Sequence, residues 1–285
     1  MKTKPVNDCP VPKGTLVIIG GKEDKTQKSK NETSDPKEVL SAFVSEIRKE
    51  KPTLEIVTTA SSEGDELFKN YIPVFESLGV KQINRIHHNE RGDVRKDPSL
   101  IDRLSKADAV FFTGGDQLKL TTIYGGTEML FLLKQRYIKE HFVIGGTSAG
   151  AMALSTPMIY AGNQQKQQIS GEVKVAVGLE FLKDVCIDTH FVDRSRMVRM
   201  AQVIATNPTS IGIGIEENTA LIVRNGLEGE ICGSGVIIVL DGRDIVSSNI
   251  LDFGTHSPLS IQGLKIDILS KENTFIIPQI NPPHI

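Results

Sequence analysis

The chain of 285 residues contains no tryptophan, only three cysteines and no long apolar segment. Cys9, Cys186 and Cys232 are too few and too widely spaced for a disulfide framework or a zinc-binding knuckle. The longest apolar runs have the length of strands, far below the ~20 residues that cross a bilayer. None near the N-terminus reaches the roughly 7–15 residues of a signal-peptide core. We therefore expect a cytoplasmic protein that does not associate with membranes.

An excess of either charge is also lacking. Lysine and arginine together number 33 and aspartate and glutamate 35, which gives a net charge of -2 and a pI near 6.3. This balance provides no electrostatic basis for binding nucleic acid. Apolar residues make up 39% of the chain and charged residues 24%. These proportions are typical of a globular protein and exclude collagen, coiled-coil and disordered classes.

Through the first 150 residues, short apolar runs alternate with longer amphipathic ones. Runs rich in β-branched or apolar residues predict strands at 15–19, 54–59, 82–86, 109–113 and 142–146. Apolar residues at helical spacing predict helices within 36–49, 66–78, 99–106 and 127–140. This alternation predicts an α/β fold, with a mostly parallel sheet covered by helices on both faces.

After about residue 210 the pattern changes. Predicted strands at 211–215, 219–224, 236–240, 265–269 and 274–277 follow one another with few helical segments between them. We expect residues 211–285 to form an antiparallel C-terminal extension of the same sheet, within a single domain of residues 1–285. Residues 1–12 are predicted to be an N-terminal tail and residues 22–37 a solvated polar loop.

The most informative motif places a serine among glycines, Gly145-Gly146-Thr147-Ser148-Ala149-Gly150. It follows a predicted strand and opens a run of helix formers, as in the Gly-x-Ser-x-Gly nucleophile elbow. Such a turn lifts the serine hydroxyl clear of the sheet and leaves backbone amides at a helix N-terminus, suited to an oxyanion. The motif by itself fits equally well an ordinary glycine-rich strand-to-helix turn, including one that binds a phosphate.

A nucleophilic serine requires a base, and the base requires an orienting acid. Among six histidines, His190 differs because it ends an apolar run and precedes a predicted arginine-bearing helix at 194–205, where α/β sheets place functional groups. Glu216 and Glu217 follow the predicted strand at 211–215. Neighbouring side chains of an extended segment point to opposite faces, so only one of the two glutamates can face His190.

A second glycine pair, Gly114-Gly115, ends the predicted strand at 109–113. The amides of this turn, Gly115 and Asp116 among them, are candidates to complete an oxyanion hole with the amide of Ala149. Asp116 is alternatively the N-cap of the following helix. The two roles are compatible.

Six segments in order resemble the motifs of the cyanophycinases, which belong to the dipeptidase-E-like serine peptidases (peptidase family S51). The resemblance runs from about residue 13 to the C-terminus. It implies a class-I glutamine-amidotransferase-like fold and a triad of Ser148 as nucleophile, His190 as base and Glu217 as acid. The segments are residues 20–24, 59–62, 112–117, 146–151, 188–199 and 212–220.

The resemblance also implies a substrate and the residues that bind it. Gln117, Asp188, Arg194 and Arg199 fall at positions that the family uses for substrate, whereas Thr189 stands where the family usually has glutamine. The resembling enzymes release β-aspartyl-arginine from cyanophycin, a polyaspartate with arginine joined to each side chain. We therefore expect a serine exopeptidase that forms an acyl-enzyme, needs no metal or organic cofactor, and is a homodimer, as family members commonly are. Restoring glutamine at 189 is expected to be neutral or to improve KM.

Three alternatives stay open. The first is an aspartyl dipeptidase of the same family. The second is an α/β-hydrolase esterase, whose triad order of serine, acid and histidine would need His256 or His284 as the base. The third is a non-catalytic binding protein on the same fold, with the serine turn as a structural element.

Overall fold

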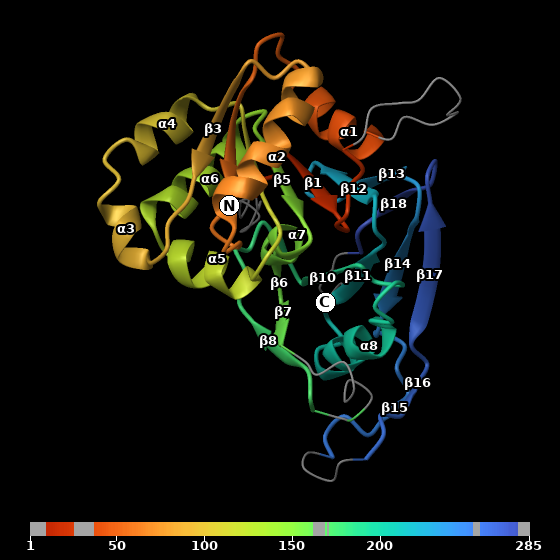
Figure 1. Ribbon diagram of the computed structural model, residues 1–285. Coiled ribbons are helices and arrows are strands. Elements are labelled where there is room, and N and C mark those ends of the chain that lie inside the picture. Colours follow the sequence, from red (N-terminus) through yellow and green to blue (C-terminus); the bar gives the residue numbers. More distant parts are fainter. Residues whose placement is uncertain (1–9, 26–36, 162–168, 170, 253–256, 279–285) are drawn as a thin grey trace, which may run out of the picture.

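The computed structural model describes residues 10–25, 37–161, 169, 171–252 and 257–278. Most of the predicted N-terminal tail, residues 26–36 of the predicted polar loop, Cys9, His256 and His284 lie outside this part of the chain. The described residues form two main sheets with helices packed around them (Figure 1).

The larger sheet contains the predicted parallel strands. Its eight strands run in the order β18-β13-β12-β1-β5-β4-β2-β3. The last five in this order, β1, β5, β4, β2 and β3, are mutually parallel. The ends of these five strands lie within two residues of the predicted ends. They are β1 (Thr15–Ile19), β2 (Thr53–Val57), β3 (Gln82–Ile86), β4 (Ala109–Phe112) and β5 (Val143–Thr147).

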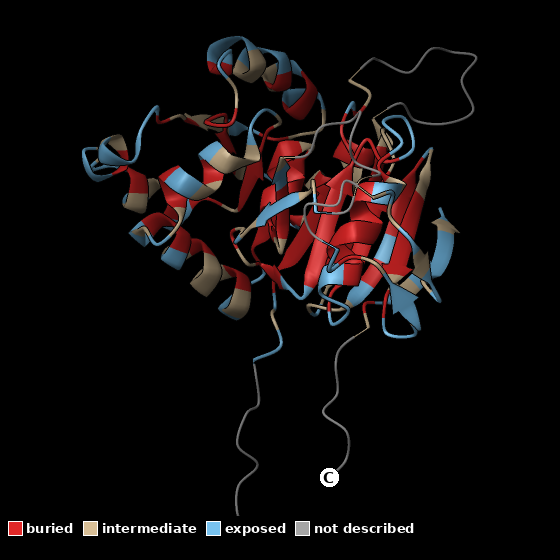
Figure 2. Ribbon diagram, turned by 90° about the horizontal axis from the view of Figure 1, so that it is seen from below, coloured by how far each residue is buried: buried red, intermediate tan, exposed pale blue. Residues whose placement is uncertain are grey.

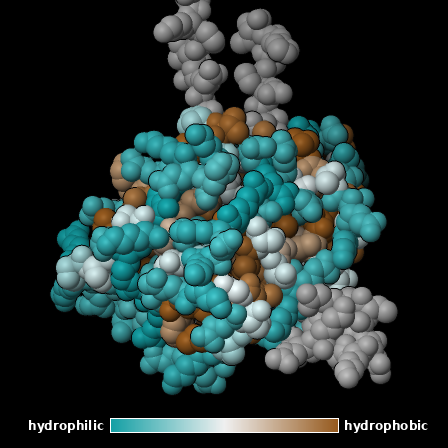
Figure 3. Space-filling view, turned by 90° about the horizontal axis from the view of Figure 1, so that it is seen from above, coloured by the Kyte–Doolittle hydropathy of each residue, from teal (hydrophilic) through white to brown (hydrophobic). Residues whose placement is uncertain are grey.

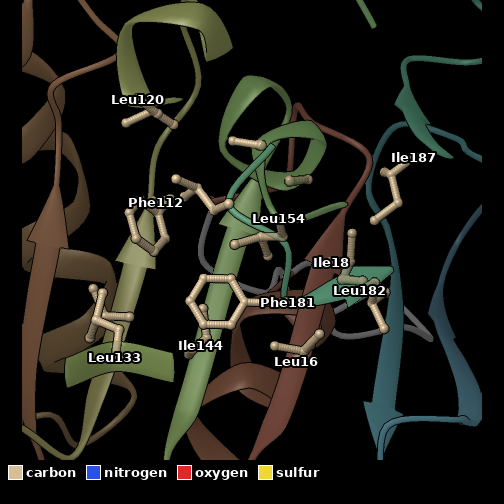
Figure 4. Packing of buried hydrophobic residues seen from close by; sticks show 14 of the residues in the cluster. Leu16, Ile18, Phe112, Leu120, Leu133, Ile144, Leu154, Phe181, Leu182 and Ile187 are labelled. Atoms are coloured by element: carbon tan, nitrogen blue, oxygen red, sulfur yellow. The ribbon is translucent and has the colours of Figure 1, made fainter. Parts of the chain in front are cut away.

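Helices cover both faces of this sheet, as predicted, because alternate strand residues are apolar on both sides. Val17 and Ile19 of β1 pack with helices α1 (Glu38–Glu46) and α2 (Gly64–Ser77). Leu16 and Ile18 belong to a cluster with the helices of the opposite face (Figure 4). Those helices are α4 (Leu100–Lys106), α5 (Gln117–Tyr124), α6 (Glu128–Lys139) and α7 (Ala149–Ala153); the short α3 (Arg91–Arg95) precedes them.

The C-terminal strands are antiparallel, as predicted, but they do not all extend one sheet. β12 (Thr219–Arg224), β13 (Glu228–Gly233) and β18 (Thr274–Ile276) continue the larger sheet beside β1. The others join a second, six-stranded sheet in the order β17-β14-β11-β10-β6-β9. Its strands are β6 (Ser155–Thr156), β9 (Leu182–Lys183), β10 (Val185–Thr189), β11 (Ile211–Ile215), β14 (Val236–Asp241) and β17 (Lys265–Ser270).

Within the second sheet, β10 and β11 pair in parallel and are joined by the helix α8 (Met197–Thr206), as the connection between two parallel strands requires. Ile187 and Ile213 face the cluster that also holds Leu16, so one core joins the two sheets (Figure 4). The prediction of a single extended sheet is therefore wrong, since β11, β14 and β17 have other partners.

Four short strands lie outside the main sheets. β7 (Met158–Ala161) pairs with β8 (Lys174–Ala176), and β15 (Ser247–Ser248) pairs with β16 (Ile261–Gln262). Figure 2 shows the central strands buried and the outer surfaces of the helices exposed. The face drawn in Figure 3 is mostly hydrophilic, with small hydrophobic areas. Across the described ranges, no helix combines the length and apolarity of a membrane span.

Candidate active site

Ser148 occupies the sharp turn that the sequence predicts between β5 and α7. Its backbone has φ 52 and ψ -118, a left-handed conformation that costs a non-glycine residue of order 1–3 kcal/mol and clusters at functional sites. The flanking glycines allow the turn: a Cβ on Gly146 would lie 2.7 Å from the Gly150 carbonyl oxygen, and one on Gly150 2.2 Å from that of Phe112. The Ser148 amide donates to the Ile19 carbonyl at 3.0 Å.

Three side chains from the ends of three strands form a hydrogen-bonded series. Ser148 Oγ lies 3.0 Å from His190 Nε2, and His190 Nδ1 lies 2.6 Å from Glu217 Oε1. Ser148 follows β5, His190 follows β10, and Glu217 comes two residues after β11. This arrangement of hydroxyl, imidazole and carboxylate can activate a nucleophile. The structure thus brings together the three residues predicted as the triad.

The surroundings of His190 favour its neutral form. The side chain is almost fully buried, and burial lowers its pKa below the ordinary value. The hydrogen bond to Glu217 opposes this effect, while the charges of Arg194 and Arg196 reinforce it. A neutral imidazole at neutral pH can accept a proton from Ser148.

Glu217 is held in its charged form. Burial raises the pKa of this carboxyl, but hydrogen bonds from Lys22 and His190 outweigh burial and leave the pKa below its ordinary value. A carboxylate opposite Nδ1 fixes the tautomer in which Nε2 is free to accept the serine proton. Its neighbour Glu216 contacts Asp193 instead; burial first, and then the hydrogen bond and charge of Asp193, raise the pKa of Glu216 to about 7.

The predicted oxyanion donors Gly115, Asp116 and Ala149 differ in what their amides bind. Gly114 lies against Ser148, since a Cβ there would be 3.3 Å from Ser148 Cβ. Within the described part of the chain, the amides of Gly115 and Ala149 donate to no protein acceptor. The amide of Asp116 donates to the Ala60 carbonyl at 2.9 Å, so its prediction as an oxyanion donor is wrong. Asp116 is the N-cap of α5, its carboxylate accepting from the Leu118 amide at 2.8 Å.

Asp188 and Arg199 face each other rather than the site. Asp188 is fully buried, and its carboxylate accepts from Arg196 Nη1 at 2.9 Å and from Arg199 Nε at 2.5 Å. Helix α8 begins at Met197, so Arg196 reaches Asp188 from the residue before the helix and Arg199 reaches it from the first turn of the helix. The structure therefore contradicts the prediction that Asp188 and Arg199 bind substrate directly. Arg196 is buried as well.

Thr189 does not reach the site either. Its side chain is fully buried, and its Oγ1 has no hydrogen-bond partner among the described residues. In a strand, alternate residues face opposite sides, and this position faces the interior. The burial of Thr189 contradicts the expectation that glutamine at 189 is neutral or improves KM, because a longer side chain would have to displace its neighbours.

The remaining two predicted substrate residues border the site. Gln117 is partly exposed at the start of α5, where its Nε2 donates to the Ile159 carbonyl at 2.7 Å. Arg194 is exposed, its amide donates to the His190 carbonyl at 3.0 Å, and its charge lowers the pKa of His190. Arg194 is thus the predicted arginine that remains open to a ligand.

Two residues of the site received no role in the sequence analysis, which placed them in the motif at 20–24 and in the predicted polar loop that begins at residue 22. Lys22 Nζ lies 2.9 Å from Glu217 Oε1, and Glu23 is buried with its Oε2 accepting from Thr147 Oγ1 at 2.6 Å. The available signal was a lysine and an acid directly after a glycine pair at a strand end. In the described ranges, no group of three or more histidine, cysteine or acidic residues is placed to hold a metal ion.

Known proteins resemble this chain over most of its length. The family model described as "Peptidase family S51" matches residues 24–228. Proteins named "Cyanophycinase" from Synechococcus elongatus and Thermosynechococcus vestitus are each 30% identical over 258 residues, which is 90% of this chain and 77% of theirs. The cyanophycinase of Geminocystis herdmanii is 28% identical over 257 residues, 90% of this chain and 91% of its own.

Solved structures share the fold. The crystal structure of a peptidase from an acI-B1 Actinobacterium gives a TM-score of 0.63 at 20% identity, over 94% of this chain and 98% of that one. A putative Peptidase E from Listeria monocytogenes EGD-e gives 0.50 at 16% identity, over 78% and 98%. These identities show the fold alone, whereas the family match and the sequence relatives extend to the activity class. The chain is a serine-type peptidase and belongs to peptidase family S51.

Proposed function

We propose that this peptidase releases β-aspartyl-arginine dipeptides from cyanophycin through an acyl-enzyme. The observation that carries the proposal is the series Ser148 Oγ, His190 and Glu217, with contacts of 3.0 and 2.6 Å. The substrate is taken from the relatives named cyanophycinase.

The first half of the reaction acylates the serine. His190 Nε2 takes the proton of Ser148 as Oγ attacks the scissile carbonyl carbon, and the carbonyl oxygen becomes negative. The amides of Gly115 and Ala149 donate to that oxygen. The imidazolium, stabilised by Glu217, then protonates the leaving amine, and the C–N bond breaks to leave an ester on Ser148.

The second half repeats the sequence with water. His190 takes a proton from the water, whose oxygen attacks the ester carbonyl, and then returns the proton to Ser148 Oγ as the dipeptide leaves. Every proton passes through His190. Its lowered pKa suits this cycle, because the base is already neutral when the substrate arrives.

The charges around the triad suit a zwitterionic substrate. A cyanophycin end carries free carboxylates and guanidinium groups. The exposed Arg194 can pair bidentately with a carboxylate. The adjacent carboxyls of Asp193 and Glu216 can accept from a guanidinium.

The test is hydrolysis of purified cyanophycin beside simple aspartyl dipeptides. We expect β-aspartyl-arginine as the product from cyanophycin, and no product with Ser148→Ala. Rapid cleavage of aspartyl dipeptides with none of cyanophycin would assign the protein to the dipeptidase alternative. Retention of either substrate without cleavage would favour a binding protein. Homodimer formation and a cytoplasmic location stay predictions.

A further inference from the structure

The turn at residues 20–24 touches all three segments that carry the proposed triad. The Gly20 carbonyl accepts from the His190 amide at 2.9 Å, and the Gly21 carbonyl accepts from the amide of Asn218, the residue after Glu217, at 2.8 Å. Directly before the turn, Ile19 accepts from the Ser148 amide. One short segment therefore fixes the ends of β5, β10 and β11 relative to one another.

The turn also packs directly against the imidazole. Gly21 has φ 100, and a Cβ there would lie 2.4 Å from His190 Cε1 and 2.5 Å from Nε2. Any side chain at this position would displace the ring. Glycine is required here both by the backbone conformation and by the close approach of His190.

The next residue, Lys22, binds the acid of the triad. Its Nζ lies 2.9 Å from Glu217 Oε1, the same oxygen that receives His190 Nδ1 at 2.6 Å. The lysine side chain is 67% exposed and that of Glu217 only 17%. Lys22 thus restrains a mostly buried carboxylate from the solvent side, without reaching Ser148.

Glu23 points the other way and binds the turn that carries the nucleophile. Its Oε2 accepts from the hydroxyl of Thr147, the residue before Ser148, at 2.6 Å. Its Oε1 accepts from the Tyr71 hydroxyl and, at 3.0 Å, from Lys25 Nζ. A carboxylate that is 5% exposed is tolerated because each oxygen has donors and one of them is a cation.

We propose that Lys22 and Glu23 are positioning residues of the proposed catalytic site. Lys22 orients Glu217, and Glu23 holds the Ser148 elbow through Thr147. Neither side chain contacts the substrate. The inference rests on the proposed function, and it concerns two residues that precede the family-model match at 24–228.

The role of Lys22 is tested by the titration of His190. The charged groups around His190 are Glu217, Arg194, Arg196 and, through Glu217, Lys22. Removing the lysine charge in Lys22→Met removes a repulsion on the imidazolium, so the pKa of His190 should rise by roughly half a unit. NMR titration of the His190 ring in the full-length protein measures this without turnover. An unchanged His190 titration would overturn this role.

Two further variants test whether the shift comes from the charge at position 22 in particular. Lys22→Arg keeps the charge and should restore the wild-type titration. Lys81→Met removes an exposed lysine at the residue before β3 and should leave His190 unchanged. In Lys22→Met the lower apparent pKa of the pH profile of kcat/KM should rise together with the pKa of His190 measured by NMR. Neither should change in Lys22→Arg or in Lys81→Met.

The role of Glu23 is tested by comparing two hydroxyls that bind the same carboxylate. Thr147→Val removes the hydroxyl next to Ser148, and Tyr71→Phe removes the one on the far side. If Glu23 positions the elbow, Thr147→Val and Glu23→Gln should each lower kcat about tenfold, the effect of losing one charge-assisted hydrogen bond, with KM little changed. Tyr71→Phe should lower kcat less than Thr147→Val does, while the two variants should lower the free energy of unfolding by similar amounts.

The double variant adds a second criterion. Both changes act on the same contact, since Glu23→Gln removes its charge and Thr147→Val removes its donor, so the two losses of kcat should be less than additive in the double variant. Equal losses of kcat in Thr147→Val and Tyr71→Phe, or additive losses in the double variant, would contradict the positioning role and show that Glu23 has only a structural role. Wild-type turnover in Ser148→Ala would instead contradict the proposed function, and the NMR titration would still decide the role of Lys22.

Discussion

Glu216 and Glu217 are adjacent in the chain but contact different groups. Glu217 accepts from His190 at 2.6 Å, whereas Glu216 shares a hydrogen bond with Asp193. The chain turns at Glu217 and Asn218, just after β11, and the sequence alone predicted that only one of the two glutamates could face His190. The geometry selects Glu217 without reference to any relative.

Glutamine variants of the two glutamates test this assignment. Glu217→Gln should lower kcat by roughly 10³-fold or more, because an amide can present its NH₂ to Nδ1 and so disfavour the tautomer that accepts the serine proton. Glu216→Gln should change kcat far less. Steady-state kinetics of both variants on cyanophycin measure the difference. The reverse ranking would show that the acid has been misassigned.

The raised pKa of Glu216 predicts that substrate binding depends on pH. Burial and the neighbouring Asp193 raise its pKa to about 7, so the group is protonated below that pH and negatively charged above it. A guanidinium binds the charged form, and KM for cyanophycin should therefore fall as pH rises through 7. In Asp193→Asn the neighbouring charge is absent, so the fall should occur at lower pH. A KM independent of pH between 6 and 8 would exclude Glu216 from substrate binding.

At the scale of single elements, the segment between β10 and α8 differs most from its prediction. An apolar run followed by charged residues indicated a strand end and a helix, but not where the charges point. The helix begins at Met197, and Asp188 gathers Arg196 and Arg199 into a buried cluster. Periodicity could not predict this, because burial of three charges depends on their being close enough to pair.

The buried cluster of Asp188, Arg196 and Arg199 is expected to stabilise the fold. Asp188→Asn removes the only carboxylate that the described residues place against Arg196 and Arg199. Breaking a buried ion pair from one side typically costs about 3–5 kcal/mol, so the midpoint of urea unfolding should fall markedly. Activity should fall as well, because His190 is two residues away. An unchanged unfolding midpoint would mean that the buried arginines need no counter-charge.

At the scale of the whole molecule, local signals predicted the first half of the fold well. Strands such as Thr15–Ile19 and Gln82–Ile86 are bounded by polar residues or glycine, and their observed ends are those predicted. The distribution of the C-terminal strands between two sheets was not predictable in this way. It depends on long-range pairing, β12 with β1 and β14 with β11, which leaves no mark in the local pattern.

The candidate site shows the same division. The elbow at Ser148 is a local motif and was recognised, since its glycines are adjacent in sequence. Lys22 and Glu23 were missed because their partners, Glu217 and Thr147, are more than a hundred residues away. Contacts of that kind appear only when the strand ends are brought together.

The central claim is that Ser148 is the nucleophile, activated by His190. A fluorophosphonate probe reacts with such a serine, and mass spectrometry of the digested protein locates the adduct. We expect one adduct per chain, on Ser148, absent in Ser148→Ala, and formed at least ~10³-fold more slowly in His190→Ala. An adduct on another residue, or an unlabelled wild-type protein that still hydrolyses cyanophycin, would contradict this account.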